Sequence, residues 1–370
     1  MPKIISIKTA FPTKYFSQNE VLDGLSGIWR KHFHNFERIQ EIFSNAGVEG
    51  RHLVLDLVKY QELNGHKDRN QYFIKESLDL ASRVLNELFI ETETFAQTIG
   101  PGDIDFFQSN SITGIMVPSI EARLCNRFAF PTWVKRLPIF GLGCLAGAAG
   151  LNRLSDYLQA FPKQAGIFLS VELCSLTFRP KDVSPANIIS SSLFGDGAGV
   201  VLMVGDMHPL AQLPGLRHLG GGSKIFHNTE RVMGWDVEDD GLAIVLSKDV
   251  AEVAKENIPE LTRQFLPQMM PQQDVSFVLS HPGGPKVLAG MQAGLDSIDS
   301  IGDEAKSFLQ LSRESLAQKG NMSSVSIMHI MQKFFEHTQT SQGRELEGKS
   351  GLYYALGPGF CAEIGALRVE

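Results

Sequence analysis

The two halves of this chain carry the same pattern of predicted elements in the same order, and this duplication limits the possible folds more than any other feature. A short β-prone apolar run with an acidic start and a polar exit occupies 103–111 and returns at 274–282. Each run is followed by an amphipathic helix that opens after a glycine, by a second strand at 165–174 or 351–360, and by a final apolar strand. Strands that alternate with helices predict mostly parallel, buried sheets covered by helices.

We therefore expect two similar halves, residues 1–215 and 216–370, because a chain of 370 residues also exceeds the usual size of one domain. The predicted helix of the first half opens at Cys144 in "GCLAGAAGL", and that of the second half opens at Asn321 in "GNMSS". His281 stands at the end of the run 274–282. Because ligands of such sheets gather at the carboxyl ends of strands, these three side chains are predicted to converge.

The composition limits the function classes. A net charge of -7 and a pI near 5.8 argue against nucleic acid and against a membrane surface as partners. The apolar stretch at the N-terminus is shorter than that of a signal peptide, and no window approaches the roughly 18 apolar residues of a membrane span. We therefore expect a cytoplasmic protein. The four cysteines show no paired spacing, so neither a disulfide framework nor a metal site is expected.

Cys144 lies between glycine-flanked turns at the start of a predicted helix, and two roles fit this position. It is either a nucleophile or a small buried thiol, since free cysteine is so often a core residue. A hydrolase-type nucleophile turn needs glycine two residues before and after the nucleophile, where this chain has Leu142 and Ala146. A dinucleotide-binding loop at "GDGAGV" would need glycine in place of Val200. The residues around Cys144 therefore leave its role open.

Six fragments that occur in a fixed order narrow the choice. They are "GCLAGAAGL", "VELCSLTF", "LFGDGAGVV", "SHPGGPKVL", "GNMSS" and "ALGPGF". Together they resemble the motif set of the chalcone synthase-like type III polyketide synthases, which belong to the thiolase-fold condensing enzymes, from about residue 40 to the C-terminus. The resemblance implies an α/β, thiolase-like fold in which two duplicated halves form a five-layer αβαβα arrangement.

The resemblance implies that Cys144, His281 and Asn321 are the catalytic residues. A thiolate is needed for thioester exchange, and a cysteine at a helix N-terminus beside an imidazolium has a lowered pKa, so His281 is the expected partner of the thiol. Decarboxylation of a malonyl thioester leaves an enolate oxygen, to which His281 and Asn321 would donate hydrogen bonds. The Cys144 backbone N–H and the loop after the last-but-one strand would stabilise the tetrahedral intermediate. That loop consists of Ala355, Leu356, Gly357, Pro358 and Gly359.

The resemblance also implies a substrate pocket, in which several positions depart from the plant pattern. The implied pocket residues are Val117, Glu172, Cys174, Thr177, Phe194, Trp235, Ile244 and Ser323. Ile244 stands where a second gate aromatic is expected, and Trp235 stands at a position that is glycine in the plant enzymes, which narrows the cavity. Val117 matches a residue that reaches into the neighbouring subunit's pocket, which implies a homodimer. Arg51 and Arg38 are the candidates for coenzyme A binding, and each is equally well explained as a solvated surface cation.

The expected function is that of a type III polyketide synthase. An acyl starter, delivered on coenzyme A or on an acyl carrier protein, is loaded on Cys144 and extended with malonyl-CoA to a pyrone, resorcinol or phloroglucinol-type product. The aliphatic Ile244 favours a fatty-acyl or small acyl starter. No cofactor is expected beyond the coenzyme A thioesters that are the substrates. The alternatives are an enzyme that condenses once, like ketoacyl synthase III, and a non-catalytic ketosynthase-like dimer partner.

Overall fold

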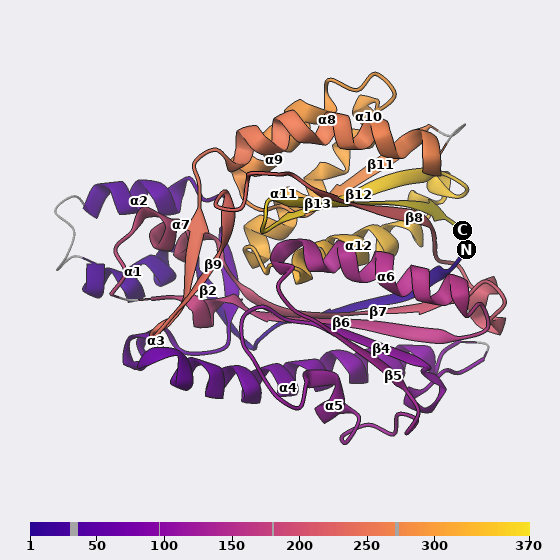
Figure 1. Cartoon of the computed structure of the whole chain (residues 1–370), viewed down its shortest axis with the longest axis horizontal. Helices are drawn as coiled ribbons and strands as arrows, with labels where there is room; N and C mark the ends of the chain where they lie inside the picture. Colours follow the sequence, from indigo (N-terminus) through magenta and orange to yellow (C-terminus); the bar gives the residue numbers. More distant parts are fainter. Residues whose placement is uncertain (30–35, 96, 180, 271–273) are drawn as a thin grey trace.

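Two groups of strands lie one above the other, with helices between them and on both outer faces (Figure 1). The computed structural model describes residues 1–29, 36–95, 97–179, 181–270 and 274–370. The first group consists of β1 (Lys3–Ala10), β4 (Phe106–Asn110), β5 (Lys135–Ile139), β6 (Ala165–Leu173) and β7 (Asp196–Val204). The second group consists of β8 (Leu216–Ile225), β11 (Val275–Ser280), β12 (Ser350–Gly357) and β13 (Cys361–Val369). The groups join where β1 pairs with β8, at Lys3–Arg217 and Ile4–Leu216.

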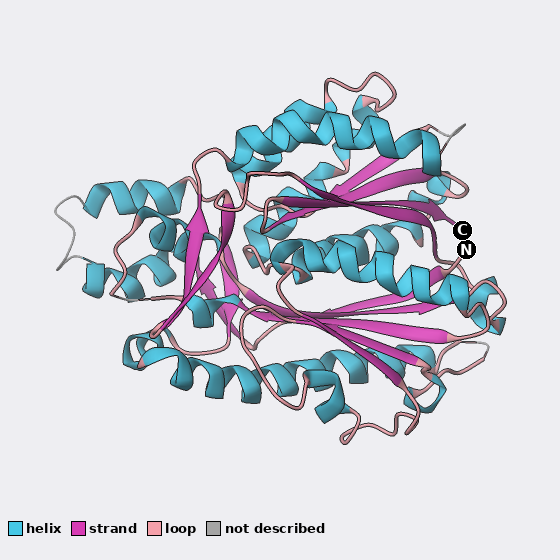
Figure 2. Ribbon diagram, viewed as in Figure 1, coloured by secondary structure: helices cyan, strands magenta, loops and turns pink. Residues whose placement is uncertain are grey.

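Helices supply the other three layers (Figure 2). The central layer consists of α6 (Ala146–Ala160) and α12 (Val325–Thr338), which pack against strands of both groups. The outer face of the first group is covered by α4 (Gly65–Thr92) and α5 (Ile120–Leu124). The outer face of the second group is covered by α8 (Val250–Met269), α9 (Pro285–Leu295), α10 (Asp303–Ser307) and α11 (Leu309–Lys319). The predicted five-layer αβαβα arrangement is confirmed, whereas the boundary at residue 215 stays a prediction.

The small residues of "CLAGAAGL" allow α6 to lie close to its neighbours. A Cβ atom at Gly147 would lie 2.3 Å from the carbonyl oxygen of Ser324, and one at Gly150 would lie 2.3 Å from the ring of Phe168. Larger side chains would therefore push α6 away from the loop before α12 and away from β6. This close packing fixes the distance of α6, whose first turn follows Cys144, from its neighbours.

The expectation of mostly parallel sheets is wrong, because the strand order is mixed. Parallel pairing is confined to β4–β5, β4–β6 and β11–β12 in the described chain. The pairs β6–β7, β1–β7, β1–β8, β8–β13 and β12–β13 are antiparallel. The turn 358–360 between β12 and β13 is one reason. It is too short for a parallel connection, which needs a crossover of a dozen or more residues.

Two small sheets and four helices form one end of the molecule, at the left of Figure 1. The sheets are β2 (Lys14–Ser17) with β3 (Gly50–Leu53), and β9 (Met233–Glu238) with β10 (Gly241–Leu246). The helices are α1 (Gln18–Trp29), α2 (Phe36–Ser44), α3 (Leu57–Glu62) and α7 (Pro185–Leu193). No helix in the described ranges is both long and apolar enough to cross a membrane.

Candidate active site

Cys144 lies in a short 3-10 turn, Gly143–Leu145, directly before α6. Gly143 has a φ of +54°, a left-handed conformation that favours glycine. A Cβ atom at Gly143 would also lie 2.8 Å from the ring of Pro358. The turn therefore packs closely against the loop after β12 and leaves the Cys144 thiol half-buried at the start of the helix.

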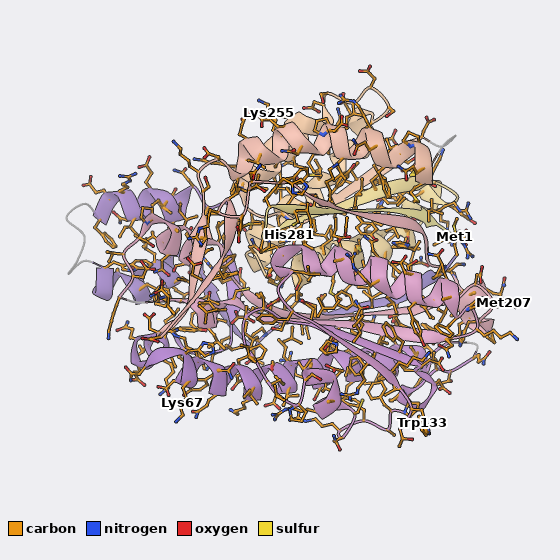
Figure 3. The ribbon with its side chains drawn as sticks, in the orientation of Figure 1. Met1, Lys67, Trp133, Met207, Lys255 and His281 are labelled. Carbon is orange, nitrogen blue, oxygen red and sulfur yellow. The ribbon has the colours of Figure 1, made fainter. Side chains whose placement is uncertain are left out.

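His281 directly follows β11, and its backbone N–H donates to the carbonyl oxygen of Tyr354 on β12 at 2.9 Å. Its side chain lies inside the protein, near the middle of the molecule (Figure 3), with 5% of the residue exposed. Among the described residues, neither ring nitrogen of His281 has a hydrogen-bond partner. A buried imidazole without protein partners is available to a substrate.

Asn321 lies between α11 and α12, and its side chain is held on both sides. Its Nδ2 donates to the carbonyl oxygen of Gly283 at 2.7 Å, and its Oδ1 accepts from the backbone N–H of Ser323 at 2.8 Å. Its backbone N–H donates to Leu193 O at 2.7 Å, next to Phe194. The carboxamide is therefore fixed in orientation before any substrate arrives.

A short series of contacts connects the three predicted catalytic residues. The Ser323 side chain lies close enough to the Cys144 thiol to lower its pKa, although burial outweighs this effect. Ser323 donates its backbone N–H to Asn321, and Asn321 donates to Gly283, two residues after His281. Residues from three distant parts of the chain therefore belong to one buried site. Ser323 itself has a φ of +51°, an uncommon conformation for a residue other than glycine.

The charge state of the site differs from the sequence-based expectation. Burial, with a smaller contribution from the nearby Glu172 carboxylate, raises the pKa of Cys144 to about 11. Burial lowers the pKa of His281 to about 3. In a dry site the charged form of each group is disfavoured, so the resting pair is a thiol and a neutral imidazole. The expected lowering of the cysteine pKa is therefore not a property of the resting site.

One wall of the pocket is built by Phe194 and the β9–β10 hairpin. Phe194 caps the C-terminal end of α7, and its ring centroid lies 6.0 Å from that of Trp235 on β9. Ile244 on β10 is the direct cross-strand partner of Trp235, so both side chains stand on the same face of the hairpin. The hairpin therefore presents one large ring and one aliphatic side chain toward this wall.

A narrow cavity lies behind the residues that the resemblance places in the pocket. Cys174 and Thr177 of the 3-10 turn Cys174–Thr177 line it together with Phe194. Its other lining residues come from α1, β3, α3, α7 and the segment around the 3-10 turn. Six are apolar or aromatic (Val21, Leu25, Leu53, Leu57, Tyr60 and Phe178) and four are polar (Arg51, Ser175, Ser190 and Ser191). The cavity therefore extends from pocket residues into the helical end of the molecule.

Glu172 is fully buried at the end of β6 in a polar network that sequence reasoning missed. Its carboxylate accepts hydrogen bonds from Asn110 Nδ2 at 3.1 Å, from Ser324 Oγ at 2.9 Å and from the backbone N–H of Ile112 at 3.2 Å. Burial nevertheless raises the pKa of Glu172 to about 7. The signal in the sequence was the polar end of β4, residues 108–110, which follows two phenylalanines.

The loop that was predicted to stabilise the tetrahedral intermediate lies beside the nucleophile turn. Ala355, Leu356 and Gly357 end β12, and Pro358 and Gly359 form the turn into β13. A Cβ atom at Gly357 would lie 2.7 Å from the side chain of Leu145 and 2.9 Å from the carbonyl oxygen of Leu142. The two backbone segments that should carry the oxyanion donors are therefore in close contact.

The candidate coenzyme A residues differ in position. Arg51 is 1% exposed, and its guanidinium donates to the carbonyl oxygens of Ser191, Ser192 and Phe194. Burial lowers the pKa of Arg51 to about 9. Since the guanidinium braces the backbone around Phe194, the expectation that Arg51 binds coenzyme A at an entrance is wrong.

Arg38 is exposed on α2, as a binding residue at an entrance would be. The structure adds a cation that the sequence analysis did not select, the exposed Lys286 in the first turn of α9. Its neighbour Pro285 packs against Gly47, just after α2. Val117 is 87% exposed and does not belong to this chain's own pocket wall. These positions come from segments that only tertiary structure brings together.

The layered fold, which holds a half-buried cysteine, a buried histidine and a buried asparagine, is that of the thiolase-fold condensing enzymes. Two family models match the chain: "FAE1/Type III polyketide synthase-like protein" at residues 33–280, and "Chalcone and stilbene synthases, C-terminal domain" at residues 221–369. The chain belongs to the type III polyketide synthase family, and it is therefore an acyltransferase-type condensing enzyme.

Similar proteins span the whole chain. A putative chalcone synthase of Bacillus subtilis is 33% identical, with 98% of each chain covered. A 1,3,6,8-tetrahydroxynaphthalene synthase of Streptomyces peucetius is 32% identical over 99% of this chain and 92% of its own. The crystal structure of the 1,3,6,8-tetrahydroxynaphthalene synthase of Streptomyces coelicolor superposes with a TM-score of 0.86 at 26% identity, covering 100% of this chain and 99% of that one.

Proposed function

We propose that this type III polyketide synthase loads a linear acyl starter on Cys144 and extends it repeatedly with malonyl-CoA to a pyrone, resorcinol or phloroglucinol-type product. The starter class rests on one observation, the contact between the rings of Phe194 and Trp235, which narrow the cavity that would hold the starter. A linear chain passes such a narrow site more easily than a wide aromatic group does. Ile244, the cross-strand partner of Trp235, adds an aliphatic side chain and no further ring.

The loading step follows from the resting charge state. The Cys144 sulfur attacks the thioester carbonyl of the starter while its proton passes to His281, so that no free thiolate has to accumulate in a dry site. Coenzyme A leaves as a thiolate and takes the proton back from His281. The backbone N–H of Cys144 and the neighbouring loop 355–359 are placed to stabilise the oxyanion of the intermediate.

The extension step uses the other two buried groups. Malonyl-CoA loses carbon dioxide, and the electron pair of the broken bond forms an enolate. The neutral imidazole of His281 donates one hydrogen bond to the enolate oxygen. The Asn321 amide has two N–H groups, and Gly283 accepts from it, so an N–H remains for the substrate within the described site. The enolate carbon then attacks the acyl carbonyl, and the bond to the Cys144 sulfur breaks.

Coenzyme A binding and dimerisation complete the proposal. Arg38 and Lys286 supply two exposed cations on either side of the contact between Pro285 and Gly47, suited to the phosphates of coenzyme A. A homodimer is supported by apolar side chains that are exposed near the edge strand β5, at Ile115, Val117, Leu137 and Phe140. Exposed apolar surface beside a free sheet edge is typical of an interface.

The test is a starter panel with radiolabelled malonyl-CoA. We expect labelled polyketides from linear acyl-CoA starters and little product from an aromatic starter. Cys144→Ala should abolish acylation, measured by intact-protein mass spectrometry, while the circular dichroism spectrum stays unchanged. Cys125→Ala, at another half-buried cysteine, is the matched control and should load normally.

Three outcomes would contradict parts of this proposal. A single extension on every starter would assign the chain to single-condensation chemistry. A preference for aromatic starters would show that the cavity does not hold the starter. Turnover by Cys144→Ala would remove Cys144 from the mechanism and favour a different nucleophile.

A further inference from the structure

We propose that Arg179 clamps the β9–β10 hairpin over the pocket and thereby sets which starters the pocket accepts. The inference rests on the proposed function, because it concerns the selectivity of the same site. Arg179 lies two residues after Thr177 and is a positioning residue, since it acts through the hairpin rather than on the substrate.

The hairpin needs an external support. It carries Trp235 and Ile244, yet it forms a sheet of its own, separate from the nine strands of the main sheet groups. A two-stranded hairpin is only marginally stable by itself in water. The position of the two pocket side chains therefore depends on what holds the hairpin against the rest of the protein.

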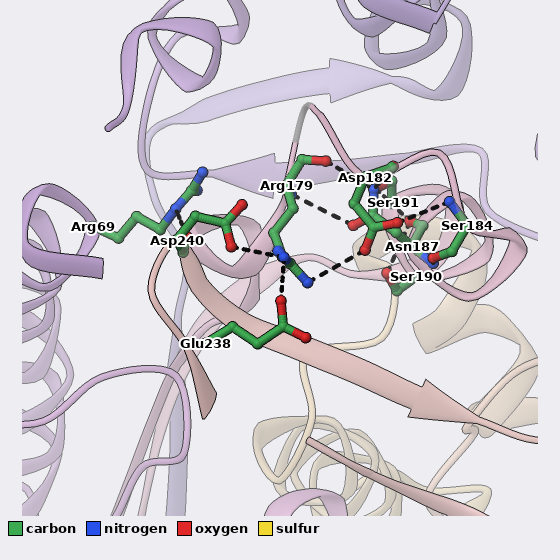
Figure 4. Close-up of polar contacts among 9 residues, drawn as sticks. All are labelled: Arg69, Arg179, Asp182, Ser184, Asn187, Ser190, Ser191, Glu238 and Asp240. Atoms are coloured by element: carbon green, nitrogen blue, oxygen red, sulfur yellow. Dashed lines mark hydrogen bonds and ion pairs between the residues drawn. The ribbon is translucent and has the colours of Figure 1, made fainter. Parts of the chain in front are cut away.

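Ion pairs at the tip of the hairpin provide this support (Figure 4). Arg179 Nη2 lies 2.6 Å from Glu238 Oε2 and 2.7 Å from Asp240 Oδ1, the residues on either side of the tip. Arg179 Nη1 lies 3.4 Å from Asp182 Oδ2 in its own segment. The Arg179 side chain is 12% exposed, so the shared cation is largely shielded from water.

A second arginine holds the same tip from the side of α4. Arg69 Nε donates to the carbonyl oxygen of Asp240 at 3.1 Å, and its Nη1 donates to the carbonyl oxygen of Leu176 at 3.1 Å. The backbone N–H of His66 donates to Asp239 O at 3.2 Å. The hairpin tip is therefore tied both to α4 and to the 3-10 turn that carries Cys174 and Thr177.

Arg179 is itself part of a rigid segment. Its carbonyl oxygen accepts from Asn187 Nδ2 at 3.0 Å, and Asn187 also donates to the carbonyl oxygen of Asp182 at 2.7 Å. Asn187 belongs to α7, which ends at Phe194. The clamp therefore connects three parts of the pocket wall: the 3-10 turn, the end of α7 and the hairpin.

The exposure of the carboxylates sets the strength of the clamp. The side chains of Glu238 and Asp240 are 50% and 44% exposed, so each ion pair is weak and is screened by salt. Loss of two such pairs from a marginally stable hairpin raises the fraction of molecules with an open hairpin by about tenfold. The hairpin is then held closed at low ionic strength but opens readily enough to admit a starter.

The experiment compares the Glu238→Gln/Asp240→Asn double variant with wild type and with Asp236→Asn. Asp236 lies on the same hairpin and forms an exposed ion pair with Arg231 at 2.8 Å, so its loss tests charge removal away from the clamp. Hydrogen exchange of residues 233–246 reports hairpin opening. Competition between short and long linear acyl-CoA starters and an aromatic one gives the ratios of kcat/KM.

We expect the double variant to exchange about tenfold faster in the hairpin and to lose starter selectivity by a similar factor. Asp236→Asn should match wild type in both measurements, and about 0.5 M salt should move wild type toward the double variant. The inference would be overturned if the hairpin of the double variant exchanged hydrogen at the wild-type rate. It would also be overturned if exchange were faster but the ratios of kcat/KM between starters were unchanged. If no protein condenses malonyl-CoA with any starter, the proposed function itself fails, which is a separate result.

Discussion

Replacing His281 with alanine is expected to slow the alkylation of Cys144, because the thiol then has no neighbouring base to accept its proton. Burial raises the pKa of Cys144 to about 11 from its usual 9, and the causes of this shift do not include His281. Two pH units correspond to about a hundredfold smaller thiolate fraction, so at pH 8 only about one thiol in a thousand is ionised in the variant. In the wild-type enzyme the neutral imidazole can take the proton while the sulfur attacks, so that labelling does not depend on a free thiolate.

The assay is the rate of iodoacetamide labelling of Cys144 between about pH 6 and pH 10, followed by peptide mass spectrometry. The His281→Ala rate should rise about tenfold per pH unit without a plateau, and the wild-type rate should be higher than the variant rate below pH 9, because the imidazole can take the proton as the sulfur attacks. Asn321→Ala should keep the wild-type profile, because a carboxamide does not exchange protons with the thiol. Labelling of the half-buried Cys125 serves as an internal control. Identical profiles for wild type and His281→Ala would refute the proton transfer.

Three further predictions concern the pocket and the interface. Folding raises the pKa of Glu172 from 4.5 to about 7, so the folded protein binds this proton more tightly than the unfolded chain does. The contribution of Glu172 to stability is therefore lost as the pH rises from 4.5 to about 7. The free energy of unfolding of Glu172→Gln, taken relative to wild type in denaturant titrations, should therefore be up to about 3 kcal/mol higher at pH 8 than at pH 4. An equal difference between the two proteins at both pH values would contradict this. Trp235→Gly removes the ring that lies against Phe194 and should raise kcat/KM for an aromatic starter relative to a linear one by about tenfold, whereas an unchanged ratio would exclude Trp235 as the limit on width. Val117→Asp places a charge on an exposed apolar side chain and should shift the sedimentation coefficient from dimer to monomer, and a persistent dimer would place the interface elsewhere.

Much of the fold could be predicted from local patterns. The apolar runs at 165–174 and 351–360 became β6 and β12, and the helices after "GCLAGAAGL" and "GNMSS" became α6 and α12. Apolar runs and glycine positions act over a few residues, so they can be recognised without knowing the partners of a segment. Strand direction was predicted less well, because it depends on which segments pair and on the length of the chain between them.

The candidate site shows the same division. The motifs selected Cys144, His281 and Asn321, but the network that holds Glu172 joins residues that are far apart in the chain, such as Asn110 and Ser324. Nothing in the neighbourhood of these residues in the sequence indicates that they meet. The polar end of β4, residues 108–110, was the one local signal.

The sequence by itself determined the duplicated order of elements, the family motifs and the three residues proposed to carry the chemistry, because these are properties of short stretches of chain. Only the tertiary structure decided that Arg51 is buried, that Cys144 and His281 rest in their neutral forms, and that Arg179 meets Glu238 across 59 positions. Burial sets the free-energy cost of a charged side chain, and long-range pairing sets the position of the pocket wall. Both depend on neighbours that folding alone brings together.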